Sequence, residues 1–199
     1  MKIKVEKQGK KKTYNLIESW EDVTLEKWVK LITFEKLSST QEAMEVLAVL
    51  TDMPKKLIRE LGIQDVANIM SRVTDLQREK KVRLKQIFEL EGKQYGFHPN
   101  LEDLTLGEWA DIETFMEQGL DNNMHNIMAV LFRPILEIEN DAYIIEAYDG
   151  NIAVRAEKFK KMSAEQVKSA LVFFFSFANV LSTTLLSSLK ALLKEKKEQ

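Results

Sequence analysis

Side chains capable of acid–base catalysis or metal binding are present in this chain of 199 residues, but their spacing matches no catalytic or metal-binding pattern. The two histidines, His98 and His125, fall in different predicted elements, and no acidic residue stands near either at the spacing of a metal triad. His98 precedes Pro99, which predicts a loop position, and His125 falls in the first turn of a predicted helix. The sequence contains no cysteine, which excludes disulfides, thiol catalysis and cysteine-based zinc sites.

Acidic residues are abundant, and helix starts account for the clearest pairs among them. Glu21-Asp22 and Glu102-Asp103 precede predicted helices, where negative charge is stabilised by the positive end of the helix dipole. Asp149-Gly150-Asn151 lacks the ligand spacing of a calcium-binding EF-hand loop. The chain has no phosphate-binding glycine loop, no nucleophile elbow and no dinucleotide-binding fingerprint. We therefore expect no catalytic residue, no cofactor and no metal site, and we predict a protein that is not an enzyme.

Three large side chains invite a functional interpretation that the pattern does not require. Trp28 and Trp109 lie on the apolar sides of predicted helices, where large aromatic residues usually pack, so both are predicted to be structural core anchors. Arg133 stands just before Pro134 at the predicted end of a helix. A cation is favourable near a helix C-terminus because of the dipole alone, so no substrate is needed to explain it.

The two tryptophans belong to a stretch that occurs twice. Residues 21–28, with the sequence EDVTLEKW, return as residues 102–109, with the sequence EDLTLGEW. The correspondence runs without a gap from Tyr14 and Tyr95 to an Ala-Val-Leu triplet in each copy. The duplication predicts two related structural modules.

Each copy is predicted to begin with a β-hairpin and to continue as helices. Residues 2–16 alternate around a glycine-containing turn, and residues 87–97 do so around a Gly-Lys turn. Apolar residues then recur at helical spacing after each Glu-Asp pair, and Thr105 and Glu108 fit a capping box. A second helix follows in each copy, and in the second copy it is predicted to run to Arg133-Pro134.

After the second copy the two halves differ. Residues 138–151 are predicted to form an extended excursion that ends in an Asp-Gly turn, and residues 152–161 a short basic helix. Residues 74–85 are the predicted connector between the halves. The predicted fold class is mainly α with two small β-hairpins (α+β), built as a duplicated hairpin-plus-helical-bundle module with a long C-terminal helix. The first module covers residues 1–80 and the second residues 81–199.

The longest predicted helix begins after Ser163, where Ser163 and Gln166 fit a capping box, and continues to about Lys197. No charged residue occurs between Ser169 and Leu189, and this run approaches the ~20 residues needed to cross a bilayer. Serine, threonine and asparagine interrupt it, and polar residues at this density are poorly suited to lipid. Three interpretations stay open: a central core helix, a partner-binding helix and a membrane-inserting tail. The candidate partner-binding residues are Phe173, Phe174, Phe177, Val180, Leu181, Leu185 and Leu189.

Composition is that of an ordinary soluble globular protein. The formal net charge is −2 at pH 7, which argues against bulk nucleic acid as the main partner. Six lysines lie between Lys2 and Lys12. They suit the solvent-facing side of a hairpin, and contact with nucleic acid is the more specific alternative. The N-terminus lacks the apolar run of a signal peptide, so we expect the protein to be kept in the cytoplasm in which it is made.

The second half contains four segments of apolar, aromatic and turn-forming residues in a fixed order, followed by a phenylalanine-rich helix. The segments are Gln94–Phe97, Leu101–Trp109, Ile127–Pro134 and Tyr143–Gly150. Together they resemble a family of small structural and assembly proteins of tailed bacteriophages, especially the crAss-like phages of Bacteroides-type hosts. Tail-assembly chaperones among these also have short helices that open with Thr-Leu-x-x-Trp/Phe. The resemblance covers residues 86–180.

The resemblance implies a non-enzymatic virion or assembly protein, located in the virion, the host cytoplasm or both. Its expected partners are other phage structural proteins of tail, portal or capsid, or copies of itself, bound through helical surfaces. Two alternatives stay open. One is a cargo or ejection protein, delivered with the genome, whose apolar residues 169–189 meet the host membrane. The other is a nucleic-acid-binding regulator that uses Lys2–Lys12 and Arg78–Lys85.

Overall fold

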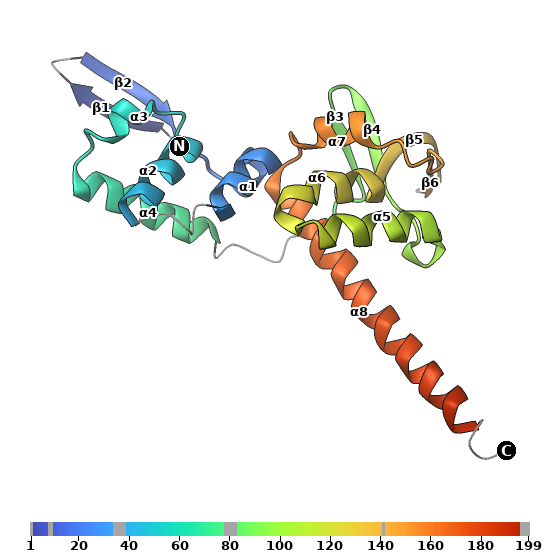
Figure 1. Ribbon diagram of the computed structural model, residues 1–199. Helices are drawn as coiled ribbons and strands as arrows, with labels where there is room; N and C mark the ends of the chain where they lie inside the picture. Colours follow the sequence, from blue (N-terminus) through green and yellow to red (C-terminus); the bar gives the residue numbers. More distant parts are fainter. Residues whose placement is uncertain (1, 8–9, 34–38, 78–82, 141, 196–199) are drawn as a thin grey trace.

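The predicted α+β fold class is confirmed by the computed structural model (Figure 1). The structure describes residues 2–7, 10–33, 39–77, 83–140 and 142–195, with side chains described in 12–33, 40–71, 83–140 and 142–179. Two groups of helices and strands meet near one short helix, α1 (Leu25–Thr33), and a long helix, α8 (Ala164–Glu195), extends away from the body (Figure 1).

The same order of elements occurs in both halves, as the duplication predicts. The first half contains β1 (Lys2–Lys7), β2 (Lys10–Asn15), the 3-10 helix η1 (Trp20–Asp22), α1, α2 (Ser39–Leu50), α3 (Lys55–Ile58) and α4 (Ile63–Gln77). The second half contains β3 (Ile87–Leu90), β4 (Lys93–Phe97), η3 (Leu101–Asp103), α5 (Leu106–Glu117), α6 (Leu120–Leu131), β5 (Phe132–Glu139), β6 (Ala142–Ile145), α7 (Ala153–Phe159) and α8. Each copy of the repeat is therefore a hairpin, a 3-10 turn and two helices.

Equivalent backbone hydrogen bonds show that the two copies fold alike. The N–H of Ile17 donates to the carbonyl of Leu50 over 3.2 Å, and at the corresponding positions the N–H of His98 donates to the carbonyl of Leu131 over 2.7 Å. Each bond ties the residue just after the hairpin to the end of the second helix. The internal similarity of the sequence is thus a similarity of tertiary structure.

The helix predicted to reach Arg133-Pro134 ends earlier, and that prediction is wrong. Helix α6 stops at Leu131, and Phe132 starts strand β5. The reason is tertiary: β5 pairs antiparallel with β4, with Arg133 opposite Gly96. Pro134 fits there because its carbonyl faces the end of β6, where it accepts the N–H of Glu146 over 2.9 Å, so its missing N–H removes no bond from the ladder to β4. The predicted extended excursion continues as β5 and β6, so the second hairpin grows into a four-stranded sheet in the order β3-β4-β5-β6.

Gly96 of β4 leaves room for a side chain of the β5–β6 hairpin to pack closely against β4. A Cβ atom on Gly96 would lie 2.5 Å from the ring of Tyr143 on β6, so only glycine leaves room for that ring. The hydroxyl of Tyr143 donates to the carbonyl of Phe97 over 2.7 Å. The β5–β6 hairpin is therefore fixed against β4 by both shape and a hydrogen bond.

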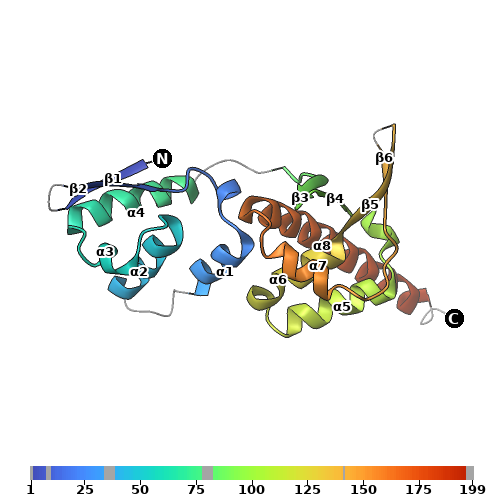
Figure 2. The ribbon, with the colours of Figure 1, turned by 90° about the horizontal axis from the view of Figure 1, so that it is seen from above.

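Two clusters of buried side chains form the core, and each receives one element from the other half. The cluster of the second half includes Leu25 of α1, and the cluster of the first half includes Ala164 of α8. Trp28 packs against both. In the views of Figures 1 and 2, α1 lies between α2 and α6, which it contacts. The division into modules at residue 80 stays a prediction, and the two cores share elements across it.

A short segment, residues 160–164 (KKMSA), joins the halves, and we call it the strap. Thr24 and Ser163 form an antiparallel bridge. The N–H of Leu25 donates to the carbonyl of Met162 over 2.7 Å, and the N–H of Ala164 donates to the carbonyl of Val23 over 2.6 Å. The strap therefore binds the start of α1 as a β-strand would.

Helix α8 starts at Ala164, the last residue of the strap. The hydroxyl of Ser163 accepts from the N–H of Gln166 over 3.1 Å, as predicted. The Gln166 side chain instead donates to the carbonyl of Lys85 over 2.6 Å. The predicted capping box is therefore only half formed, because Gln166 ties α8 to the segment before β3.

Candidate partner-binding surface

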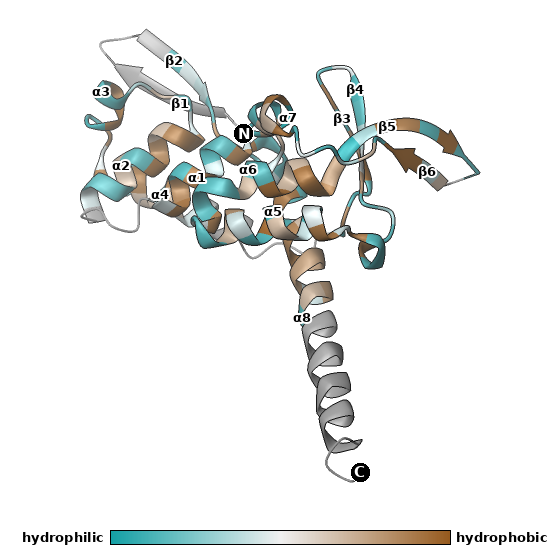
Figure 3. Cartoon of the chain, turned by 45° about the vertical axis from the view of Figure 1, so that its right-hand side comes forward, coloured by the Kyte–Doolittle hydropathy of each residue, from teal (hydrophilic) through white to brown (hydrophobic). Residues whose placement is uncertain are grey.

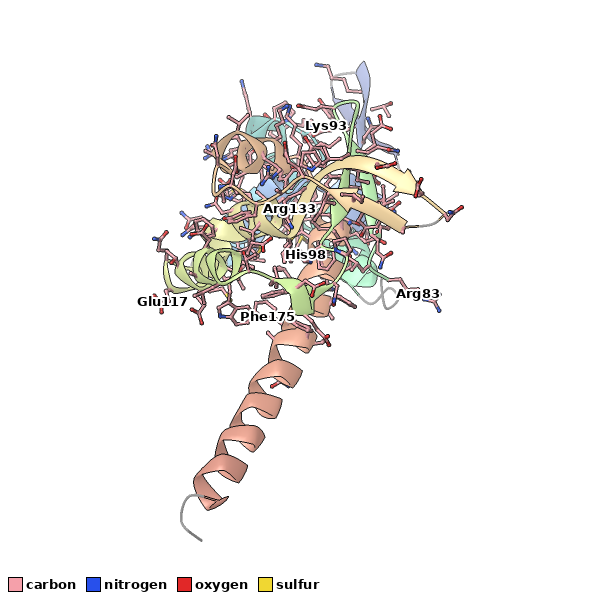
Figure 4. The ribbon with its side chains drawn as sticks, turned by 90° about the vertical axis from the view of Figure 1, so that its right-hand side faces the viewer. Arg83, Lys93, His98, Glu117, Arg133 and Phe175 are labelled. Atoms are coloured by element: carbon pink, nitrogen blue, oxygen red, sulfur yellow. The ribbon has the colours of Figure 1, made fainter. Side chains whose placement is uncertain are left out.

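The buried ionisable side chains of the part of the chain that the structure describes lie in the second half. Glu108, Arg133 and His98 are 1%, 5% and 8% exposed, and Figure 4 shows His98 and Arg133 close together within the body. A guanidinium nitrogen of Arg133 lies 2.9 Å from Oε1 of Glu108, and Nε2 of His98 lies 3.7 Å from the same oxygen. The prediction that Arg133 serves a helix C-terminus is wrong, because it stands in β5 and neutralises a buried carboxylate.

The second oxygen of Glu108 completes the predicted capping box. Oε2 accepts from the N–H and from the hydroxyl of Thr105, each over 2.7 Å, and Thr105 Oγ1 accepts from the N–H of Glu108 over 3.2 Å. Arg133 also lies 5.9 Å from the ring centre of Tyr148, whose hydroxyl donates to Asp111. The cluster thus fixes β5 and the segment after β6 to helix α5.

Burial decides the protonation of this cluster. Removal from water lowers the pKa of His98, although Glu108 opposes the shift. Burial, followed by the hydrogen bond to Asp111, raises the pKa of Tyr148. Among the described side chains, His98 Nδ1 and Arg133 Nε have no hydrogen-bond partner, and the close approach of Arg133 to Oε1 of Glu108 is an ion pair rather than an aligned hydrogen bond. The buried ion pair holds β5 against helix α5.

The second histidine is separate from this cluster. His125 lies in the second turn of α6, not the first, because the helix starts at Leu120. Its pKa is lowered by burial first and by Lys160 next. Among the residues that the structure describes, no group of three or more His, Asp or Glu side chains could hold a metal ion.

An apolar surface opens where α8 leaves the body. Val172, Phe173 and Phe175 are 61%, 48% and 38% exposed. Beside them is an open hollow of about 540 Å³ between α1, α6 and α8. Its lining residues are Trp28, Leu120, Met124, Lys168, Leu171, Val172, Phe175, Ser176 and Asn179. The hydropathy colouring of Figure 3 shows apolar residues along the first turns of α8 beyond the body. The apolar character of the core therefore continues along α8 onto the surface.

The predicted partner-binding residues fall into three groups. Phe174 is 1% exposed and packs against Trp109, with ring centres 6.0 Å apart. Phe173 is half exposed and meets Phe97 edge to face, and Phe177 packs partly buried against the core. The side chains of Val180, Leu181, Leu185 and Leu189 lie outside the described residues. Both predicted anchors, Trp28 and Trp109, are partly buried against the core.

Sequence reasoning missed Val172 and Phe175 as surface residues and missed the hollow. The signal was present in the helical spacing of residues 168, 171, 172, 175, 176 and 179, which share one side of α8. The partners Trp28, Leu120 and Met124 come from helices far away in the sequence. Periodicity within α8 could not have identified them.

No helix in the part of the chain that the structure describes combines the length and apolar character required to span a bilayer. Comparison with protein-family models, curated proteins and solved structures finds no match to this chain.

Proposed function

We propose that the protein is a non-enzymatic bacteriophage virion or assembly protein that binds a helix of another phage structural protein at the base of α8. One observation carries the proposal: exposed Val172 and Phe175 border an open apolar hollow. Exposed apolar surface rimmed by polar residues is typical of protein-binding sites. The resemblance of residues 86–180 to tailed-phage proteins supplies the class of partner.

The hollow suits an amphipathic helix that lays its apolar side into a groove. Lys168, Ser176 and Asn179 form a polar edge around apolar residues from three helices, the arrangement expected of an interface core and rim. Complete burial of a large apolar side chain contributes roughly 1.5–3 kcal/mol, so covering the exposed 61% of Val172 and 38% of Phe175 contributes about 1 kcal/mol for each. No bond is made or broken in this mechanism.

The test is co-expression with the proteins encoded beside this chain in its genome, among which the proposal expects tail, portal or capsid proteins. Complexes are measured by size-exclusion chromatography with light scattering. We expect one of these proteins to co-elute with the wild-type chain and to be lost with Val172→Glu or Phe175→Glu. Leu136→Glu is the matched control, since Leu136 is 67% exposed on β5 and should leave the complex intact. A complex that survives both α8 substitutions, or no complex with any of these proteins, contradicts the proposal.

A further inference from the structure

Two hairpins of opposite charge lie at opposite ends of the body (Figures 1 and 2). The basic hairpin, residues 2–15 of β1 and β2, contains six lysines and one glutamate. The acidic hairpin, residues 135–146 of β5 and β6, contains three glutamates and one aspartate and no lysine or arginine. Because the two hairpins are far apart in one molecule, a contact between them requires two molecules.

The acidic hairpin has an open edge. Strand β6 is the last strand of the four-stranded sheet, and no strand in the part of the chain that the structure describes pairs with its outer side. The N–H of Glu146 donates to the carbonyl of Pro134 on β5. Since successive residues of a strand direct their backbone groups to alternate sides, the N–H and carbonyl groups of Tyr143 and Ile145 point to the open edge. The ring and the hydroxyl of Tyr143 are fixed against β4, so this edge is ordered before another strand pairs with it.

Apolar side chains at this edge are exposed to water. Ile144 of β6 is 57% exposed, and Leu136 and Ile138 of the adjoining strand β5 are 67% and 49% exposed. Proteins usually protect an edge strand with charged residues, but β6 itself, with the sequence AYII, contains none. An ordered, uncharged edge with exposed apolar residues is suited to the addition of a strand.

Strand β1 matches this edge. Among the strands that the structure describes, β1 pairs with β2 alone, so one side of it is also open. Its sequence, KIKVEK, alternates lysine with Ile3 and Val5, whereas β2 begins with three consecutive lysines, which disfavour pairing at its own edge. A two-stranded hairpin is only marginally stable in water, so a third strand would stabilise it.

We propose that copies of this chain associate head to tail, with β1 of one copy added to the open edge of β6 in the next. Hydrogen bonds between the two backbones hold the strands together, and the apolar residues of β1 cover those beside β6. The contact joins two different surfaces, so each pair of copies keeps one open edge of each kind to which further copies add. The proposal does not depend on helix binding at α8, because neither hairpin contributes to that surface.

Charge selects this pairing over the symmetric alternatives. Glu137 and Glu139 are exposed, and neither forms an ion pair with a residue that the structure describes. Pairing β6 with β6 would bring two acidic hairpins together, and pairing β1 with β1 would bring two basic hairpins together. Only the contact between unlike hairpins brings opposite charges together, which favours the correct encounter.

The first test is sedimentation velocity of the full-length protein at increasing concentration. We expect the sedimentation coefficient to rise with protein concentration. The rise should be smaller at high salt, because salt screens the attraction between exposed charges. A wild-type protein that sediments as a monomer at every concentration overturns the proposal.

Two complementary variants test the direction of the contact. Ile144→Lys places a charge on the β6 edge, and the combination of Lys2→Glu with Lys4→Glu reverses the charge of β1. Each should weaken self-association about tenfold. A mixture of the two should form one-to-one pairs, because the unchanged β1 of the first fits the unchanged β6 of the second. Wild-type association by either variant, or no association in the mixture, overturns the head-to-tail contact.

Two controls separate this contact from loss of the fold and from the surface on α8. Val154→Lys on α7 replaces another exposed β-branched residue, which is 71% exposed, and should associate like the wild type. Circular dichroism should show the same helix content in every variant. Val172→Glu should also associate like the wild type. If Val172→Glu abolished self-association, the copies would be joined through α8 and the proposal would be wrong.

Discussion

The two copies of the repeat place an ion pair at the same two positions with opposite polarity. Lys27 pairs with Asp52 in the first copy and Glu108 with Arg133 in the second, and the members of each pair are equivalent by the offset that relates the two tryptophans. The first pair is 3.5 Å long, with side chains 37% and 70% exposed. The second is 2.9 Å long, with side chains 1% and 6% exposed.

The difference follows from what comes after the second helix of each copy. After α2 the chain passes through Asp52, with φ 52°, into the short helix α3. After α6 it enters β5, and the new sheet, together with Tyr148, shields Arg133 from water. Equivalent positions in the two copies thus hold a solvated pair in one context and a desolvated pair in the other. The equivalent sequence positions determine where each ion pair lies. The sheet that covers the second pair determines how deeply that pair is buried.

Removing the cation of each ion pair should produce the largest difference in stability between the two copies. Arg133→Met should lower the free energy of unfolding by about 3–5 kcal/mol, because it leaves Glu108 charged, buried and unpaired. The matched variant Lys27→Met should cost about 0–1 kcal/mol, because Asp52 stays hydrated. Urea unfolding followed by circular dichroism measures both. Equal losses in the two variants would show that the pairs do not differ in energy.

Removing the threonine that caps α1 or α5 should produce a smaller difference in stability between the two copies. Thr105 accepts the N–H of Glu108 and also donates to its carboxylate, whereas the Thr24 hydroxyl accepts only the N–H of Lys27, over 3.3 Å. Thr105→Ala should cost about 2 kcal/mol and Thr24→Ala about 1 kcal/mol. Thermal unfolding of the two variants ranks them. A larger loss for Thr24→Ala would contradict the assignment of the stronger cap to the second copy.

Between pH 7.5 and 5.5 we expect the pH dependence of stability to come from the two histidines of the second copy. Both histidines lie there, and burial lowers the pKa of each in the fold. The unfolded chain protonates at a pKa of about 6.5. Below that pH it binds more protons than the folded chain, so the free energy of unfolding falls as pH decreases.

Unfolding measured between pH 7.5 and 5.5 checks this expectation. His98 faces Glu108 and Arg133, and His125 faces Lys160 and Glu157. Each of His98→Gln and His125→Gln should flatten the curve in part, and the double variant should flatten it further. A wild-type protein that gains stability between pH 6.5 and 5.5 would reverse the sign of the argument for both groups.

The sequence predicts elements well where local chemistry decides them. The capping box of Thr105 and Glu108, the two hairpins and the helices of each copy all depend on residues a few positions apart. Arg133 was misplaced because apolar spacing in α6 continues through Phe132, and only pairing with β4 ends the helix. The 84% exposure of Leu106 could not be predicted, since its equivalent Leu25 follows the same threonine at the start of a helix and is 1% exposed. The hollow at α8 depends on helices from both halves.

The strap also determines how a pull on α8 would travel through the molecule. Helix α8 begins at the residue whose N–H is bonded to Val23, so load applied to its far end reaches α1 through that bond and the neighbouring bond to Met162. It reaches α7 through the covalent chain. Before it reaches the strap, the load passes Phe174, Leu171 and Val167, which are buried in the core of the second half. A partner attached to the long helix would therefore load that core first, and the strap would carry to α1 only the load that this core passes on.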